Sequence, residues 1–363
     1  MYRGAIAKLV APLIKSYLRR NELMRRYTVL LMTSFFLIIC AVAGGVYISG
    51  HAVKSDNGTS LSTIRVYTTL PVESVARLAD EYESLSRVRV NFIPVTAEEL
   101  EERAGIPGKA DMVLADSRVL NRLAGLGWLV PYFGETSDAV SSVLKNEEGF
   151  WTAVWYDPIV FCYNRDYAAN NPKLPMTWHE LAADEGSRVA MTDFLAADAA
   201  SNLLFSLVSQ YGEENGFNIF SELHPRVVQY SKFLSTPVRM TGMGEVDMSI
   251  AVQSEVLRYI NDGYPLRIVY PQDGTAFSMV GTGILLGAAE DEQAKAFADW
   301  LQGDEAQLVL QTNGMYFIPA NRNTMAYKKY TGKGIVLFDA PADLSAERRR
   351  GLLDFWVKNI RIR

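Results

Sequence analysis

The feature that most constrains the fold is the segment over residues 149–164, which reads GFWTAVWYDPIVFCYN. An aromatic turn that carries Asp157 and Pro158 leads into an apolar run at 159–163, and a polar turn ends it. A short apolar run bounded by turn residues is typical of a buried strand. The pattern predicts a strand that passes from one lobe of the protein to another, with a cleft at the crossing.

Strand-like and helix-like patterns alternate before this segment. Alternating apolar residues predict strands, and apolar residues at helical spacing predict helices. Strands that alternate with helices indicate an α/β fold with a mainly parallel sheet. The predicted elements are strands at 64–68, 88–94 and 110–114 and helices at 72–82, 98–104 and 118–126.

Several segments, in this order, resemble those of a known family. ADMVLADSRVLNRLAGLGWLVPY at 110–132 is similar to the family's third strand and following helix, and GEVDMSI at 244–250 is similar to a strand of its second lobe. AKAFADWL at 294–301 is similar to a helix signature of the family. With the segment at 149–164, the chain resembles bacterial extracytoplasmic solute-binding proteins of ABC importers, the ferric-binding-protein-like group.

The resemblance covers residues 62–360. It implies the type II periplasmic-binding-protein fold, an α/β architecture of two lobes with a ligand cleft between them. We expect the chain to divide into a basic cytoplasmic tail at 1–26, a transmembrane anchor or signal peptide at 27–48, a linker at 49–61, a first lobe at 62–155 and 271–322, and a second lobe at 156–270 and 323–363.

The N-terminal region predicts attachment to a membrane. Residues 27–48 are apolar and uncharged, and about 20 such residues cross a bilayer as a helix. The preceding tail is strongly basic, so the positive-inside bias keeps it cytoplasmic and places the globular part outside, periplasmic or on the cell surface. We favour an uncleaved anchor. Ala41-Val42-Ala43 leaves cleavage by a signal peptidase open, as does a true start at Met24.

Composition argues against several classes of protein. A net charge of −5 provides no basic field for nucleic acid. Two cysteines, Cys40 and Cys162, and three scattered histidines give no zinc-binding spacing. No P-loop or G-x-S-x-G motif is present in the sequence. We therefore expect no metal site, no cofactor and no catalytic residues, and the resemblance implies a monomeric binding protein rather than an enzyme.

Candidate ligand-binding residues follow the predicted strands, because open α/β sheets bind ligands beyond the carboxyl ends of strands, near helix N-termini. We favour Asp116, Trp155 and Asp157. Ser117 and Asp198 could equally be helix caps, and Trp155 and Tyr156 could pack between the lobes. The full set is Thr69, Asp116, Ser117, Trp155, Tyr156, Asp157, Asp198, Gln253, Ser254 and Glu255.

Departures from the family pattern narrow the solute. Ferric-binding members carry adjacent tyrosines where this chain has Ser254 and Glu255, so the comparison disfavours tyrosine-bound iron(III). Carboxylates such as Asp116 and Asp157 beside Trp155 favour a cationic or polar organic solute. The resemblance implies a membrane-tethered protein that delivers this solute to an ABC permease and its ATPase. A sensor module that acts through a partner stays open, as does an enzyme on the same fold.

Overall fold

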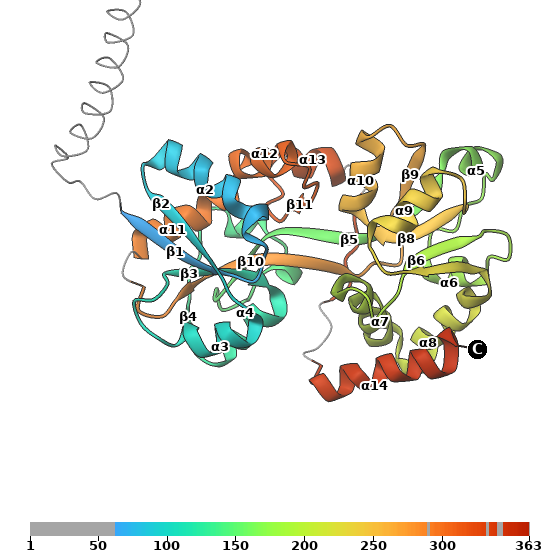
Figure 1. Cartoon of the computed structure of the whole chain (residues 1–363), viewed down its shortest axis with the longest axis horizontal. Coiled ribbons are helices and arrows are strands. Elements are labelled where there is room, and N and C mark those ends of the chain that lie inside the picture. The colour runs from blue at the N-terminus through green and yellow to red at the C-terminus, as the bar shows by residue number, and fades with distance from the viewer. Residues whose placement is uncertain (1–61, 289–290, 332–333, 340–343, 363) are drawn as a thin grey trace, which may run out of the picture. The chain divides into compact units, whose positions relative to one another are not determined.

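The structure is a computed structural model, and it describes residues 62–288, 291–331, 334–339 and 344–362. These residues belong to one compact unit, in which two lobes are joined by long strands (Figure 1). The predicted tail, membrane anchor and linker at 1–61 lie outside the described residues. Within the part that is described, no helix is both long enough and apolar enough to cross a bilayer.

The first lobe is built around a parallel sheet. β1 (Thr63–Thr68) pairs in parallel with β2 (Arg89–Pro94) on one side and with β3 (Met112–Asp116) on the other. A short strand, β4 (Leu129–Val130), pairs with the end of a later antiparallel strand. The predicted α/β architecture is confirmed, although antiparallel strands make the sheet mixed.

A helix follows each of the three strands β1, β2 and β3, and side chains cap two of the three helices. α2 (Val72–Ser86) follows β1, and α3 (Ala97–Ala104) follows β2. Thr96 begins α3 with a capping box, in which its hydroxyl accepts the Glu99 N–H. α4 (Ser117–Gly125) starts directly after β3, where the Asp116 carboxylate accepts the first free N–H groups.

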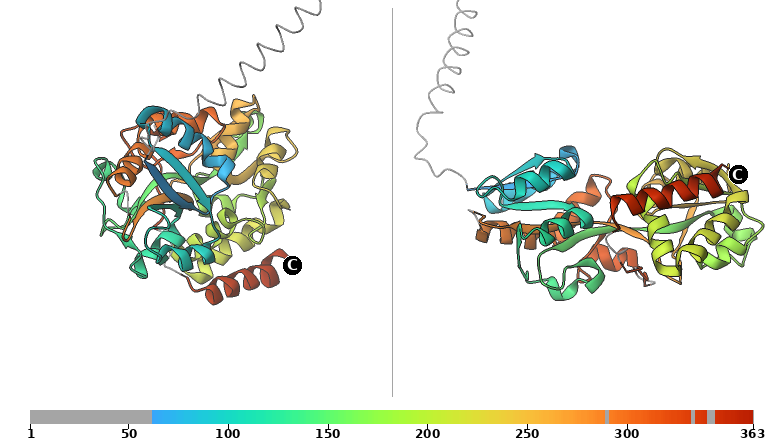
Figure 2. Two further views of the ribbon diagram at one scale, coloured as in Figure 1. Left: turned by 60° about the vertical axis from the view of Figure 1, so that its left-hand side comes forward. Right: turned by 90° about the horizontal axis from the view of Figure 1, so that it is seen from below.

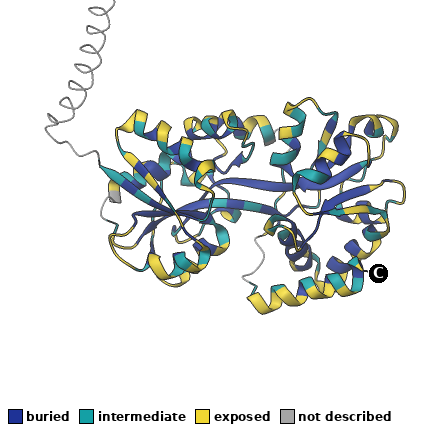
Figure 3. Cartoon of the chain, in the orientation of Figure 1, coloured by how far each residue is buried: buried dark blue, intermediate teal, exposed yellow. Residues whose placement is uncertain are grey.

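Two antiparallel strands connect the lobes. β5 (Thr152–Asn164) and β10 (Phe277–Leu285) pair with each other, and β10 also pairs with β3. Beyond Pro158, β5 leaves β10 and pairs with a strand of the second lobe from Ile159 onward. The strand predicted at 159–163 therefore forms one half of a longer crossing strand, which is buried nearly throughout (Figure 3).

The second lobe has its own sheet and surrounding helices. The main strand order through both lobes is β2-β1-β3-β10-β5-β8-β6-β7, with β9 paired to β5. The strands of this lobe are β6 (Val189–Thr192), β7 (Val227–Ser231), β8 (Met248–Val252) and β9 (Leu266–Val269), and its helices are α5 (Arg165–Asn170), α6 (Trp178–Ala183), α7 (Asp198–Tyr211), α8 (Glu213–Leu223), α9 (Ser235–Gly242) and α10 (Gln253–Asn261).

The part of the chain after β9 returns to the first lobe and then crosses again. α14 (Ala346–Trp356) lies along the second lobe, where Leu352 and Trp356 join its hydrophobic core (Figure 2). The remaining elements are α11 (Asp291–Leu301), α12 (Asp304–Thr312), β11 (Ile318–Pro319), α13 (Met325–Thr331), α14 (Ala346–Trp356) and a π-helical turn at Val357–Arg361.

The packing of the C-terminal part bears on the lobe boundary predicted at 322/323. Tyr327, Tyr330 and Leu337 pack against a core cluster of the first lobe, whereas Phe338 belongs to the cluster of the second lobe. We therefore propose that the last piece of the second lobe begins at about residue 338, because the preceding segment buries its apolar side chains in the first lobe.

Candidate functional site

A pocket of about 240 Å³ lies between residues of the two lobes. The first lobe contributes the start of α4, and the second lobe contributes one face of α7. Strand β10 and the start of α14 complete the wall. Its lining residues are Asp116, Ser117, Arg118, Asn121, Val143, Trp151, Asp198, Asn202, Phe205, Phe277, Ser278, Met279, Val280, Leu344 and Arg349.

The start of α4 supplies a carboxylate and a guanidinium. Asp116 Oδ1 accepts the backbone N–H of Arg118 at 2.9 Å, which fixes the carboxylate at the helix N-terminus. Arg118 Nε lies 3.5 Å from the same oxygen. The other end of the guanidinium, Nη2, reaches across the pocket to Asp198 Oδ2 at 3.1 Å. One arginine of the first lobe thus joins carboxylates of both lobes.

Asp198 is the first residue of α7, and no side chain caps this helix at Ala197. A carboxylate is favourable there because it interacts with the positive end of the helix dipole. The side chain of Asp198 is 83% exposed. One turn later, Asn202 Nδ2 donates to the Phe277 carbonyl at 2.9 Å and joins α7 to β10. Asp198 therefore supplies the charge at this helix start, while Asn202 fixes α7 against β10.

Aromatic and cationic groups form the rest of the wall. Trp151 Nε1 donates to Asn121 Oδ1 at 2.8 Å, which holds the indole against α4. Arg349 places its guanidinium 4.7 Å from the centre of the Phe205 ring, a cation–π geometry. The C-terminal helix thereby places a positive charge in a pocket whose other walls come from much earlier in the chain.

Four of the predicted site residues gather elsewhere, around the start of α10. Asp157 accepts the Ser254 N–H at 2.9 Å and the Ser254 hydroxyl at 2.5 Å. Glu255 pairs with Arg258 on the same helix, and Gln253 is fully buried. Burial raises the pKa of Asp157 to about 7; the bonds from Ser254 oppose this rise, and the Glu255 charge adds to it. None of these four residues lines the 240 Å³ pocket.

The other predicted residues lie in different surroundings. Trp155 is 3% exposed and stacks on Phe317, with ring centres 5.8 Å apart. Tyr156 is also buried, edge-on to Phe277. Thr69 is partly exposed and does not line the pocket. Of the predicted set, the pocket brings together Asp116, Ser117 and Asp198.

Over the described residues, no group of three or more histidine, cysteine, aspartate or glutamate side chains could hold a metal ion. The residues that line the pocket offer hydrogen bonding, ion pairing and aromatic contact. A known family accounts for such an arrangement of two lobes: residues 65–316 match the bacterial extracellular solute-binding proteins. The chain belongs to this family.

The chain is also similar to individual proteins and solved structures. An uncharacterized protein of Haemophilus influenzae is 26% identical over 257 residues, which are 66% of this chain and 72% of that protein. The fold is that of the periplasmic binding protein AfuA of Actinobacillus pleuropneumoniae with fructose-6-phosphate bound (22% identity, TM-score 0.62, covering 84% of this chain and 100% of AfuA). Iron-bound HitA of Pseudomonas aeruginosa also shares it (18% identity, TM-score 0.63, covering 81% and 98%).

Sequence reasoning missed several pocket residues of this solute-binding protein. Arg118 and Asn121 lie on the predicted helix that follows Asp116, one residue or one turn beyond the favoured positions. The strand-to-helix pattern could have found them, since a ligand at a helix start also meets the next exposed positions. Arg349 carried no such signal, because no strand precedes its helix.

Proposed function

We propose that this solute-binding protein takes up a polar organic solute in the pocket between its lobes and delivers it to an ABC permease and its ATPase. The supporting observation is the Arg118–Asp198 pair, which spans the pocket from one lobe to the other at 3.1 Å. A solute that bonds to either partner contacts both lobes through that pair. Binding would therefore be coupled to the relative position of the lobes, and the closed form would be the form presented to a permease.

The charges in the pocket favour a solute that is polar rather than strongly charged. Asp116 and Asp198 are matched by Arg118 and Arg349. Because Arg118 already contacts both carboxylates, a cationic solute has to compete with it. An anionic solute meets Asp198 at the start of α7, where like charges repel. Hydroxyl, amide or zwitterionic groups of a solute can bond to the carboxylates and to the guanidinium groups of the pocket. Trp151 and Phe205 can then cover an apolar part of the solute.

Tyrosine-bound iron(III) is a poor match for this chain. The start of α10 carries Ser254, which is committed to Asp157, and Glu255, which pairs with Arg258. Neither residue offers a phenolate, the hard oxygen ligand that ferric relatives use at these positions.

A thermal-shift screen of residues 62–363 tests this proposal. The panel contains sugars, amino acids, polyamines, thiamine derivatives, phosphate esters and iron(III). A ligand that binds the native state raises the melting temperature by mass action. We expect a shift from a polar organic member and none from iron(III), and Arg118→Ala should weaken binding of that member about 10- to 100-fold.

Arg122→Ala is the matched control. Arg122 lies one turn further along α4 and makes one exposed ion pair, with Glu101 at 3.1 Å, outside the pocket. Its replacement should leave the affinity unchanged. Equal losses in both variants, or a shift from iron(III) alone, would contradict the proposal.

We also propose that residues 27–48 tether the protein to the membrane with its lobes outside the cytoplasm. The support is the uncharged apolar run behind a basic tail. Protease added to intact spheroplasts should digest the lobes, and digestion only after lysis would show that the lobes are inside.

A further inference from the structure

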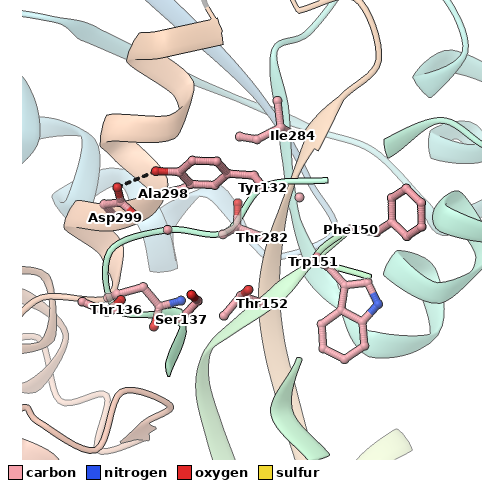
Figure 4. Close-up of a pocket in the computed structure, with 14 residues that line it drawn as sticks. Tyr132, Thr136, Ser137, Phe150, Trp151, Thr152, Thr282, Ile284, Ala298 and Asp299 are labelled. Carbon is pink, nitrogen blue, oxygen red and sulfur yellow. Dashed lines mark hydrogen bonds between the residues drawn. The ribbon is translucent and has the colours of Figure 1, made fainter. Parts of the chain in front are cut away.

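A second, much smaller pocket lies within the first lobe. Its volume is about 30 Å³, too small for an organic solute. It lies between the segment from Tyr132 to Ser137, the start of β5, strand β10 and the end of α11 (Figure 4). Apart from Trp151, it shares no lining residue with the pocket between the lobes. It is therefore a distinct site.

Two buried oxygens in its wall lack a hydrogen-bond partner among the described residues. They are Thr282 Oγ1 on β10 and Gln302 Oε1 just after α11. The two residues are 5% and 4% exposed. The Gln302 amide is oriented by its nitrogen, which donates to the Ala153 carbonyl at 2.8 Å, so its oxygen is left for another donor. Buried polar groups of this kind are normally hydrogen-bonded.

A carboxylate beside the pocket already has a hydrogen-bond partner. Tyr132 donates its hydroxyl proton to Asp299 Oδ2 at 2.5 Å (Figure 4). Gly134 allows the carboxylate to approach, since a Cβ on Gly134 would lie 2.1 Å from Asp299 Oδ1. Burial raises the pKa of Asp299. Asp299 Oδ2 is therefore engaged by Tyr132, whereas Thr282 Oγ1 and Gln302 Oε1 lack a partner among the described residues.

We propose that this pocket binds one ordered water molecule, which donates hydrogen bonds to Thr282 Oγ1 and Gln302 Oε1. A water needs roughly 10–15 Å³ of such space and two to four polar partners. The pocket supplies the volume and both acceptors, with the hydroxyls of Thr136, Ser137 and Thr152 in the same wall.

The position of this water gives it a mechanical role. Thr282 pairs with Thr152 across the two crossing strands, and Gln302 bonds to Ala153 on β5. The water therefore joins the first-lobe ends of both crossing strands to the end of α11. It holds those ends in the first lobe, so that movement between the lobes has to occur further along the strands.

The sign of a change in melting temperature tests this site in the full-length chain. Thr282→Val replaces a hydroxyl with a methyl group of the same shape. If the hydroxyl bonds a water, the melting temperature should fall by about 2–4 °C. Thr275→Val calibrates that loss, because the Thr275 hydroxyl is fully buried and donates directly to the Ile159 carbonyl at 2.7 Å. Thr282→Ser keeps the hydroxyl and should fall less than Thr282→Val.

An unchanged or higher melting temperature for Thr282→Val would overturn the proposal, because removal of an orphaned hydroxyl is neutral or stabilising. A crystal structure grown with choline as the only cation gives an independent readout. We expect density within roughly 3.2 Å of both oxygens. No density there would overturn the water site. Density that appears in crystals grown with sodium or potassium but is absent with choline would identify a cation and would overturn the water site equally.

Discussion

Two aspartates at helix starts of the second lobe occupy opposite surroundings. Asp198 begins α7, is 83% exposed and pairs with Arg118 of the first lobe. Asp157 reaches the start of α10 from strand β5, is 8% exposed and receives its bonds from the neutral donors of Ser254. Water screens the first carboxylate, so its ion pair can break and re-form at little cost. Burial holds the Asp157 carboxylate in place where the crossing strand β5 contacts α10 of the second lobe.

The largest expected difference between them is in stability. Asp157→Ala removes the acceptor of two partly buried donors of Ser254, and we expect the free energy of unfolding to fall by roughly 2–4 kcal/mol. Asp198→Ala removes an exposed pair, and we expect a loss below about 0.5 kcal/mol. Urea denaturation of both variants measures the two values. Equal losses would show that burial does not separate the two sites.

The pH dependence of stability should come from Asp157. Its folded-state pKa is raised by burial to about 7, above the ordinary value of an aspartate. Its contribution to the free energy of unfolding is therefore fully present below that ordinary value and is lost as the pH rises toward 7. The slope is at most about 1.4 kcal/mol per pH unit for one proton.

Denaturation curves taken between about pH 4 and 8 check this prediction. This range brackets both the unperturbed pKa of a carboxyl group and the raised one. Asp157→Asn should remove most of the slope, whereas Asp198→Asn should leave it in place. Glu255 and Tyr270 lie near Asp157 and interact with its charge. Glu255→Gln is therefore the control, because it shows whether the slope comes from titration of Glu255 instead of Asp157. A slope that survives Asp157→Asn would refute the assignment.

The smallest expected effect concerns anions in the pocket. Asp198→Asn removes the carboxylate at the start of α7 and leaves Arg118 with Asp116 as its remaining carboxylate neighbour in the pocket, which is a more favourable setting for an anion. Inorganic phosphate should then raise the melting temperature of this variant slightly, and that of the native protein less. Asp157→Asn should respond to phosphate as the native protein does, because its site lies outside the pocket. A native protein that responds as strongly as Asp198→Asn would mean that Asp198 does not repel anions.

Much of the fold followed from local patterns. The apolar run at 159–163 predicted a crossing strand, and β5 is that strand. The turn predicted at Asp157 and Pro158 was wrong, because both residues lie within β5. The site was predicted less completely. Asp116 and Asp198 were found because they lie at predicted helix starts, where open α/β sheets bind ligands. Asp116 also caps its helix, whereas Asp198 is the first residue of α7 and not its cap. Trp155 has the same aromatic signal as Trp151, but it stacks in the core on Phe317, while Trp151 lines the pocket. The alternation of a strand cannot tell which of its two faces meets a ligand, because both faces of this strand are buried.

The sequence by itself determined where strands and helices begin and which helix starts carry charge, because capping, periodicity and turn chemistry act over a few residues. Tertiary structure decided which of these helix starts lie next to one another. Arg118 and Asp198 are 80 residues apart and share one pocket, whereas Asp157 and Ser254, 97 residues apart, form a separate buried pair. The register between β5, β10 and β8 determines which of these side chains come into contact. That register depends on contacts among strands that no local pattern encodes.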